Sequence, residues 1–381
     1  MRVRIKIVTI ITGLSAGGTE SMLLKLLQQI DKKSFEFSVI SLTTKGKIGK
    51  HIEVLGIPVY SMGMTRIPSP SKFYKLVKLL KRLKPRVVHT RLNHANLVGG
   101  IAARFAGTEC ISWGIHQSNI SLKHNKLTTL FIIKICAWLS RWIPHRILSN
   151  SKHAKQVHVS AGFCEKKFYI IPNGFDLRKF KIDINARVSV RKELNLSVNS
   201  ILVGLIGRND IQKNHTGFLE AALEVSKYVD KAHFVLVGEG IDNKNLYLLE
   251  MVEKMNLGEK FHFLGFRNDI PKIMASLDIL ASTSHGEAFP NVLGEAMSCG
   301  VPCVVTDVGD CAEIIGNCGR VVAVKDMTGL GRQIVKLLQL NPMQKKILGE
   351  KARARINSKF EINSVVKCYQ DFYMRLLEGE H

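Results

Sequence analysis

Two basic residues, Arg208 and Lys213, lie between a predicted buried strand at 201–207 and the helix that follows it. A guanidinium and an ammonium group at the carboxyl end of a strand suit a diphosphate, whose negative charges need compensation in a cleft. Both residues are also common in solvated loops, so the pair alone leaves a surface role open. It predicts an anion site if a second, independent signal falls nearby.

Two carboxylates eight positions apart, Glu287 and Glu295, follow another predicted strand at 278–282. A Pro-Asn dipeptide between them is typical of a helix start, which places Glu295 about one turn inside the helix. The glutamates can accept hydrogen bonds from sugar hydroxyls, or they are a helix cap and a surface acid. The backbone N–H groups at this helix start can bind an anion, and they are expected around Phe289, Asn291 and Val292.

In the N-terminal half, two glycines and a histidine follow predicted strands. Gly17 and Gly18 stand in the loop between the strand at 5–12 and the helix at 20–30, where they form either a tight turn or a close approach to a phosphate or sugar. His116 follows the strand at 110–115 and either orients the acceptor or is structural. No His, Cys or Asp cluster has metal-ligand spacing, so we expect a site without metal.

The elements that must position these residues alternate along the whole chain. Of 381 residues, 46% are hydrophobic and 23% charged, which excludes a disordered or coiled-coil protein and predicts two or three domains. Short β-branched runs alternate with helical spacing, which predicts parallel α/β sheets. We expect two doubly wound lobes, a boundary near 172–192 and a ligand between the lobes at the carboxyl ends of the strands.

The formal net charge of +24 is concentrated in one half. Residues 1–171 hold 28 basic and 6 acidic side chains, whereas residues 172–381 hold 27 and 25. The first half should therefore be attracted to polyanions such as anionic lipids. Nucleic acid is not expected as a partner, because no recognised binding motif accompanies the charge.

The eight cysteines form no Cys-x-x-Cys pair and suggest reduced thiols in the cytoplasm. The N-terminus has basic residues before an apolar run but lacks a hydrophobic segment of signal-peptide length. The apolar stretch at 127–143 contains Lys134 and Arg141 and is too short to span a membrane.

Several of these segments occur together in an order that resembles the retaining GT-B glycosyltransferases of family 4. The resemblance covers nearly the whole chain and is strongest at 170–324. The residues that carry it are 170–180 (IIPNGFDLRKF), Arg208 with Lys213, 237–240 (VGEG), 263–266 (FLGF), Glu287 with Glu295, and 295–302 (EAMSCGVP).

The resemblance implies a fold and a set of roles. It implies two Rossmann-like domains facing each other across a cleft: an acceptor-binding domain at 1–171, a nucleotide-sugar domain at 172–358, and a C-terminal helix at 359–381 that packs back on the first domain. By match to the family motifs, Glu287 holds the donor sugar and Glu295 the ribose. By the same match, Arg208 and Lys213 bind the diphosphate, and Phe266 and Arg267 contact the base.

The implied activity is transfer of a hexose from a UDP- or GDP-sugar with retained configuration, without a metal or other cofactor. From the basic half we expect a glycan or lipid-linked acceptor at the inner face of the membrane, with the protein cytoplasmic and peripheral. A basic amphipathic helix at 71–83 and a second surface would dock there, the latter comprising Lys123, Lys126, Lys134, Arg141, Trp138 and Trp142. A sugar-nucleotide epimerase, a phosphorylase and a non-catalytic nucleotide-sugar-binding protein are the alternatives.

Overall fold

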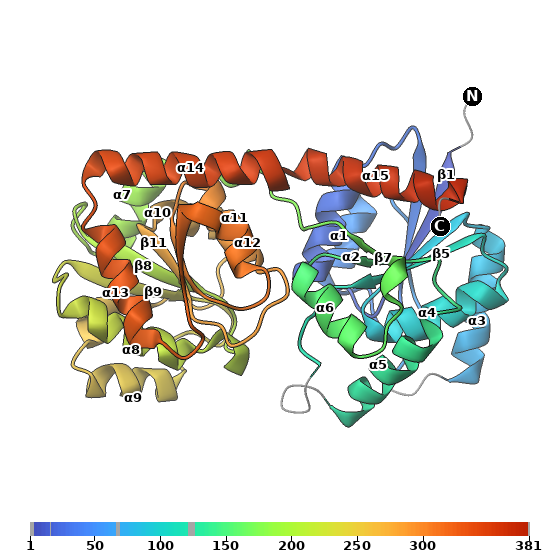
Figure 1. Cartoon of the computed structure of the whole chain (residues 1–381), viewed down its shortest axis with the longest axis horizontal. Helices are drawn as coiled ribbons and strands as arrows, with labels where there is room; N and C mark the ends of the chain where they lie inside the picture. Colours follow the sequence, from blue (N-terminus) through green and yellow to red (C-terminus); the bar gives the residue numbers. More distant parts are fainter. Residues whose placement is uncertain (1–3, 16, 66–68, 121–125, 380–381) are drawn as a thin grey trace. The chain divides into compact units, whose positions relative to one another are not determined.

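The computed structural model describes residues 4–15, 17–65, 69–120 and 126–379. The chain divides into two compact units, which are labelled by element in Figure 1. Unit 1 comprises Met1–Gly174 and Ile362–His381, and unit 2 comprises Phe175–Glu361. The limits fall at Gly174 and Glu361, a few residues beyond the predicted ones at 171 and 358.

Unit 1 is built on a seven-stranded, wholly parallel sheet with the order β3-β2-β1-β4-β5-β6-β7. Its strands are β1 (Ile5–Ile11), β2 (Phe35–Ser41), β3 (Val59–Ser61), β4 (Val87–Arg91), β5 (Cys110–Ile115), β6 (Arg146–Ser149) and β7 (Phe168–Ile170). Its α-helices are α1 (Gly18–Gln29), α2 (Gly46–Val54), α3 (Pro70–Leu83), α4 (Asn93–Phe105), α5 (Leu127–Leu139), α6 (Lys152–Ser160) and α15 (Ile362–Glu378).

Unit 2 repeats this plan with six parallel strands in the order β10-β9-β8-β11-β12-β13. The strands are β8 (Ile201–Ile206), β9 (Ala232–Val237), β10 (Phe261–Phe263), β11 (Ile279–Ser282), β12 (Cys303–Thr306) and β13 (Gly319–Val322). The α-helices are α7 (Ile184–Glu193), α8 (His215–Ser226), α9 (Leu246–Lys254), α10 (Ile270–Ser276), α11 (Asn291–Ser298), α12 (Cys311–Ile315), α13 (Met327–Leu338) and α14 (Pro342–Phe360).

Both sheets are doubly wound, because the strand order reverses direction once in each. The reversal falls between β1 and β4 in unit 1 and between β8 and β11 in unit 2. Loops at the carboxyl ends of two such strands diverge to opposite faces and leave a crevice, which is where open α/β sheets bind ligands. We therefore look for the site in the loops at these two reversal points.

The strands are apolar on both faces, as expected for parallel sheets covered by helices. In β1 every residue from Ile7 to Ile11 is buried, and the same holds throughout β4 and β5. The C-terminal helix α15 joins this core although it is far away in sequence. Its buried face comprises Ile362, Val365, Val366, Tyr369, Phe372, Tyr373 and Leu376, and it packs against α1.

The predicted strands match the observed ones to within a residue or two at each end. The short strand β7 (Phe168–Ile170) was not predicted, because its three residues are only partly buried and show no period of their own. In α3 the apolar stripe predicted at 71–83 packs inward through Leu76, Leu79 and Leu80. Within the described part of the chain, no helix combines the length and apolar character needed to cross a membrane.

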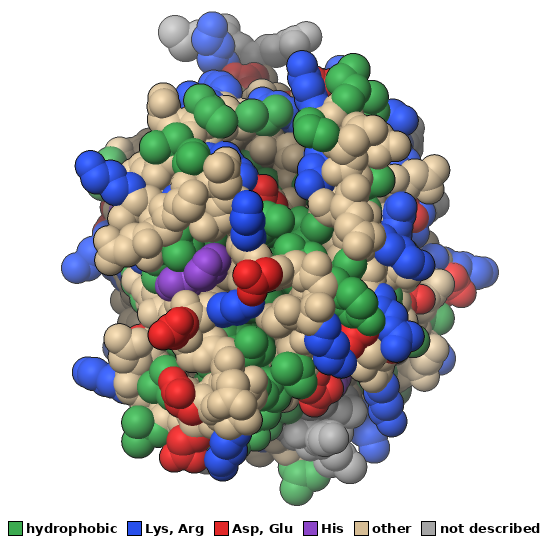
Figure 2. Space-filling model, turned by 90° about the vertical axis from the view of Figure 1, so that its left-hand side faces the viewer, with side chains coloured by type: hydrophobic (Ala, Val, Ile, Leu, Met, Phe, Trp, Pro, Cys, Tyr) green, Lys and Arg blue, Asp and Glu red, His purple; other side chains and the backbone are tan. Residues whose placement is uncertain are grey.

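The even charge of the second half is visible on the face of the molecule drawn in Figure 2. Acidic and basic side chains lie interspersed there, and neither sign gathers into a patch. A mixed surface of this kind does not attract polyanions at long range. By residue count, the excess positive charge belongs to residues 1–171.

Candidate active site

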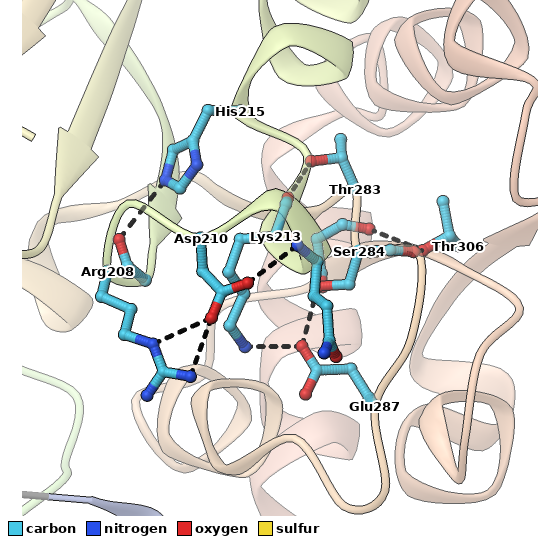
Figure 3. Close-up of polar contacts among 11 residues, drawn as sticks. Arg208, Asp210, Lys213, His215, Thr283, Ser284, Glu287 and Thr306 are labelled. Carbon is cyan, nitrogen blue, oxygen red and sulfur yellow. Dashed lines mark hydrogen bonds and ion pairs between the residues drawn. The ribbon is translucent and has the colours of Figure 1, made fainter. Parts of the chain in front are cut away.

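The loop after β8 presents Arg208 and Lys213 at the reversal point of the unit 2 sheet (Figure 3). Lys213 ends a single 3-10 turn, Ile211–Lys213, and the next residue, Asn214, has a left-handed φ of 50°. The Asn214 side chain accepts a hydrogen bond from the Gly217 amide and so caps α8. Asp210 caps the 3-10 turn in the same way, through the Gln212 amide. Two consecutive side-chain caps therefore define the backbone path of this short loop.

Asp210 fixes the first of the two cations. The Nε and Nη2 groups of Arg208 both donate to Oδ2 of Asp210, at 3.1 and 2.8 Å, while Oδ1 accepts from the Gln212 amide at 3.0 Å. Burial alone would raise the pKa of Asp210, but the Gln212 amide and the Arg208 guanidinium hold it below its ordinary value. Asp210 is therefore an ionised bracket that fixes one edge of the guanidinium.

Lys213 meets Glu287, which follows β11 on the other side of the reversal point. Lys213 Nζ donates to Glu287 Oε1 at 2.5 Å, and the Ser284 hydroxyl donates to the same oxygen at 2.8 Å. The side chains are only 25% and 13% exposed. The pair is thus largely withdrawn from water, where a charge-assisted hydrogen bond is strong and an unpaired charge is costly.

Two threonines fix the loops that carry this pair. Thr283 Oγ1 lies 3.0 Å from the Lys213 carbonyl and 2.8 Å from the Asn214 carbonyl, and it is the donor to both. Thr306, at the end of β12, donates to the Ser284 carbonyl at 2.6 Å. Both hydroxyls donate to backbone carbonyls and so hold these loops in position (Figure 3).

Gly309 lies directly behind Glu287. Its φ is +55°, and a Cβ built on it would fall 2.3 Å from the Glu287 carbonyl oxygen and 2.7 Å from that of Ala288. The backbone after β12 therefore approaches the Glu287 loop more closely than any side chain allows. Neither the charge pattern nor the apolar pattern of the sequence points to this contact.

Helix α11 begins at Asn291, where the Pro-Asn dipeptide predicts it, and Glu295 lies inside its second turn. The Phe289 side chain, in contrast, belongs to the core. Its ring packs against Phe175 and Phe360, at centroid distances of 6.2 and 5.7 Å. Because Phe289 is only 7% exposed, its backbone N–H, and not its side chain, is the group that it can offer to a ligand.

The turn after β10 carries Phe266 and Arg267, the two residues predicted to contact the base. Phe266 is 60% exposed and offers a ring face to a planar group. Arg267 is held by carboxylates: it donates to Glu193 at 2.5 Å and to Asp269 at 2.7 and 2.8 Å. These carboxylates raise the pKa of Arg267, against the effect of burial. In this structure the Arg267 side chain braces the turn, and its contact with a base stays a prediction.

In unit 1, Gly17 and Gly18 form the start of α1 at the end of β1. Gly17 is the N-cap and has extended φ and ψ angles, and Gly18 is the first helical residue. A Cβ on Gly17 would meet the Glu20 carboxylate, which is a flexible side chain. The loop is consistent with the predicted strand-to-helix turn, but Gly17 has no left-handed strain that would demand glycine.

His116 directly follows β5, as predicted, and is partly exposed. Burial, and secondly the positive charge of Arg91, hold the pKa of His116 well below its ordinary value. Arg91 Nη1 lies 3.5 Å from His116 Nε2. The imidazole is therefore neutral at physiological pH and can donate a hydrogen bond at one nitrogen and accept one at the other.

Arg91 is the residue of this region that the sequence analysis missed. It ends β4, its side chain is fully buried, and its guanidinium lies 5.5 Å from the ring centre of Tyr369 in α15. Its Nε and Nη2 groups have no hydrogen-bond partner among the described residues. A single arginine closing the run Val87–Arg91 was the available signal, but a strand-end cation does not by itself reveal that it is buried.

The arrangement in unit 2 can hold a dianion beside a polyol. Arg208 and Lys213 supply the positive charge, and Glu287 supplies an acceptor for hydroxyl groups. Within the described ranges, no three His, Cys, Asp or Glu side chains gather in a way that could hold a metal ion. The available groups are therefore cations, carboxylates and backbone amides.

Two parallel, doubly wound units with these groups at the reversal points define the GT-B fold. Solved structures agree on the fold. The Anabaena protein HepE in complex with UDP and glucose superposes with a TM-score of 0.84 at 22% identity, covering 97% of this chain and 100% of that chain. Sucrose-phosphate synthase from Thermosynechococcus elongatus gives 0.80 at 18% identity, covering 98% and 100%.

The family follows from the sequence models. Residues 16–179 match the model described as Glycosyltransferase Family 4, and residues 200–340 match that of Glycosyl transferases group 1. The chain belongs to this family, which confirms the predicted resemblance and makes it a glycosyltransferase.

Curated relatives share this activity. A UDP-Gal:alpha-D-GlcNAc-diphosphoundecaprenol alpha-1,3-galactosyltransferase from Escherichia coli is 28% identical over 84% of this chain and 83% of its own. An N,N'-diacetylbacillosaminyl-diphospho-undecaprenol alpha-1,3-N-acetylgalactosaminyltransferase from Campylobacter jejuni is 26% identical over 81% of both chains.

Proposed function

We propose that this glycosyltransferase moves a hexose-type sugar from a nucleoside diphosphate donor, UDP- or GDP-linked, to a saccharide carried on a polyprenyl diphosphate, with retained configuration and without a metal. The observation that carries the proposal is the Lys213–Glu287 pair beside Arg208 at the reversal point of unit 2. The names of the curated relatives support the acceptor class, since two of them act on diphosphoundecaprenol-linked substrates.

In this mechanism the bond between the anomeric carbon and the diphosphate oxygen breaks, and the acceptor oxygen bonds to that carbon from the same face. The acceptor hydroxyl proton passes to the departing phosphate oxygen, so the products are a nucleoside diphosphate and the lengthened saccharide. An oxocarbenium-like sugar lies between the two events, and no protein nucleophile is required.

The protein contributes mainly charge and orientation. Arg208 and Lys213 stabilise the departing diphosphate more strongly as its negative charge grows, which lowers the barrier rather than merely strengthening substrate binding. Amides at the start of α11 add donors to the same anion. Glu287 binds hydroxyls of the sugar, Glu295 those of the ribose, and exposed Phe266 stacks on the base.

The acceptor side is assigned to unit 1. The positive charge of residues 1–171 attracts a lipid-linked diphosphate and the anionic inner surface of the membrane. We place the protein peripherally at that surface. His116, neutral and at the end of β5, orients the acceptor or donates to the transferred sugar. Close backbone approach at Gly17 and Gly18 admits the transferring sugar near the start of α1.

A thermal-shift screen with UDP-, GDP- and ADP-sugars tests the donor assignment. A ligand present at 100 times its Kd should stabilise the native state by about 2.7 kcal/mol. We expect a shift with one nucleotide class that disappears in Arg208→Ala. No shift with any of the three classes, at concentrations that support turnover in relatives, would contradict the proposal.

Product analysis tests the reaction. Incubation with the identified donor and a polyprenyl-diphosphate saccharide should give a lengthened lipid with an α-linkage from an α-linked donor. Release of an altered sugar nucleotide would instead indicate an epimerase, and donor binding without any turnover would indicate a binding protein.

A further inference from the structure

The outer face of α5 exposes an apolar, aromatic stripe. Leu127, Phe131 and Trp138 are 75%, 66% and 64% exposed, and Trp142, just after the helix, is 52% exposed. Their spacing of four, seven and four residues places them along one side of the helix. The Trp138 and Trp142 rings are in contact, with centroids 4.9 Å apart.

The opposite face of α5 already fulfils the structural role of the helix. Ile133, Cys136 and Ala137 are buried, and the helix packs on α4. The fold therefore does not need the outer side chains to be apolar. Single exposed apolar residues are ordinary, but four of them on one side of a helix, two of them tryptophans in contact, mark an interaction surface.

The charged residues of α5 and of the segments next to it in sequence are all basic. Lys126, Lys134 and Arg141 are exposed beside it, and Lys123 lies outside the described residues. Between Glu53 and Glu165 the chain holds seventeen lysines and arginines and one acid, Glu109. That acid is paired with Arg86 at 2.8 Å.

Helix α3 extends the basic surface on the other side of α4, since α3 contacts α4 and α4 contacts α5 (Figure 1). Helix α3 buries Leu76, Leu79 and Leu80. Its exposed residues are mainly basic: Lys75, Lys78, Lys81 and Arg82, with Tyr74 beside them. The layer thus divides two tasks between its helices, with cationic attraction on α3 and apolar anchoring on α5.

We propose that the outer face of α5 is the membrane anchor of this protein. Leu127, Phe131, Trp138 and Trp142 enter the interfacial region of an anionic leaflet, while the neighbouring lysines and arginines contact lipid phosphates. Tryptophan rings favour this depth because they are amphipathic, and basic residues favour anionic headgroups. The inference rests on the proposed lipid-linked acceptor, which must be reached at a membrane surface.

A second copy of the chain is the weaker candidate for this face. A two-fold interface brings the same patch against itself. It would oppose Lys126, Lys134 and Arg141 to their own copies, and like charges facing each other disfavour association.

The tryptophans provide the readout. The chain has three, and Trp113 is fully buried in β5, so the exposed pair dominates any change in emission at the surface. The full-length protein is mixed with vesicles of phosphatidylcholine with or without phosphatidylglycerol at low salt. We expect a blue shift and co-flotation with the anionic vesicles, and neither with the neutral ones.

Trp138→Ser/Trp142→Ser should float with anionic vesicles on the order of tenfold less well, because two interfacial anchors are lost. Tyr247→Ser is the matched control, since this aromatic residue is 65% exposed on α9 of unit 2. Equal vesicle binding by the double variant and the parent would overturn the proposal. So would a change in sedimentation from dimer to monomer, which would assign the face to self-association.

Donor binding keeps this test separate from the proposed reaction. The double variant should retain the thermal shift with its nucleotide sugar and lose turnover only with vesicle-embedded acceptor. Failure of the transfer reaction in a protein that floats normally would contradict the proposed function and leave the anchor standing. Absence of vesicle binding by the parent, with donor binding intact, would overturn the anchor alone.

Discussion

Lys213 Nζ and Glu287 Oε1 lie 2.5 Å apart although 74 residues separate them in sequence. Each follows one of the two strands, β8 and β11, between which the order of the unit 2 sheet reverses. The contact therefore joins the segment with the two cations to the segment with the predicted sugar-binding acid. Because the ammonium and carboxylate groups are already held in place, little free energy is needed to reorganise them when a diphosphate and a sugar bind together.

Removing either cation should reduce turnover far more than it reduces stability. We expect Arg208→Ala and Lys213→Ala each to lower kcat on the order of 10²-fold, as with loss of one preorganised electrostatic donor. Steady-state kinetics with the donor identified by thermal shift measures this. Lys227→Ala, at a 58% exposed lysine of unit 2, is the control and should stay near the parent. Near-normal turnover in both site variants would refute their assignment.

Asp210 should act as a positioning residue through Arg208. Asp210 accepts hydrogen bonds from Nε and Nη2 of Arg208. Asp210→Ala therefore keeps the guanidinium charge but no longer fixes its position, and we expect kcat to fall by roughly tenfold or more. Free guanidinium added to Arg208→Ala should restore part of the activity, because Asp210 remains to hold it. The double variant should not respond. Equal restoration in the single and double variants would show that Asp210 does not hold the guanidinium.

Gly309→Ala should impair the site by a steric route. The new Cβ would meet the Glu287 and Ala288 carbonyls, so the Glu287 loop must move, and a displacement of about 1 Å can cost roughly 10²-fold in rate. Gly107→Ala is the matched control: its φ is +74° and nothing lies within 4 Å of the added Cβ. Kinetics and thermal unfolding of both variants separate the effects. A similar loss of activity in the two would attribute it to backbone strain alone.

Unit 1 should lose stability as the pH falls below neutrality. Burial, then the charge of Arg91, hold the pKa of His89 well below its ordinary value. The unfolded chain takes up a proton near pH 6.5 that the native state refuses, so the free energy of unfolding decreases as pH falls through that value. For one such histidine the loss is about 1.4 kcal/mol at pH 5.5.

Denaturant unfolding at pH 7.5 and 5.5 measures this, and tryptophan emission reports unit 1 because residues 113, 138 and 142 all belong to it. His89→Leu removes a fully buried imidazole whose two nitrogens have no hydrogen-bond partner among the described residues. It should reduce the pH dependence by that amount. An unchanged difference between the two pH values would place the titration elsewhere, for example on His116.

Much of the fold could be predicted because parallel strands and their helices carry strong local periodicity. β5 was predicted to the residue, and β8 and β11 to within one. The three-residue β7 escaped, since so short a strand forms only where β6 already offers an edge. In the site, Arg208, Lys213 and Glu287 were predicted from residue type and motif, and the geometry brings these three together.

Other site residues could not be judged from the sequence. The resemblance made Arg267 a candidate for base contact, and the structure adds that Glu193 from α7 pairs with its side chain. Phe289 was predicted to offer its backbone N–H to an anion, and the structure adds that Phe175 and Phe360 enclose its ring. In both cases the deciding partner is distant in sequence, so no local pattern contains the information.

The sequence by itself determined the class of fold, the family, the uneven charge and the types of group available for chemistry, because periodicity, composition and motif spacing are local properties. Tertiary structure alone decided which groups meet. It paired Lys213 with Glu287, placed Gly309 behind Glu287, buried Arg91 beside His116 and left the tryptophans of α5 outside. Each of these outcomes depends on packing between segments far apart in the chain, where burial and distance, rather than residue type, fix the role of a side chain.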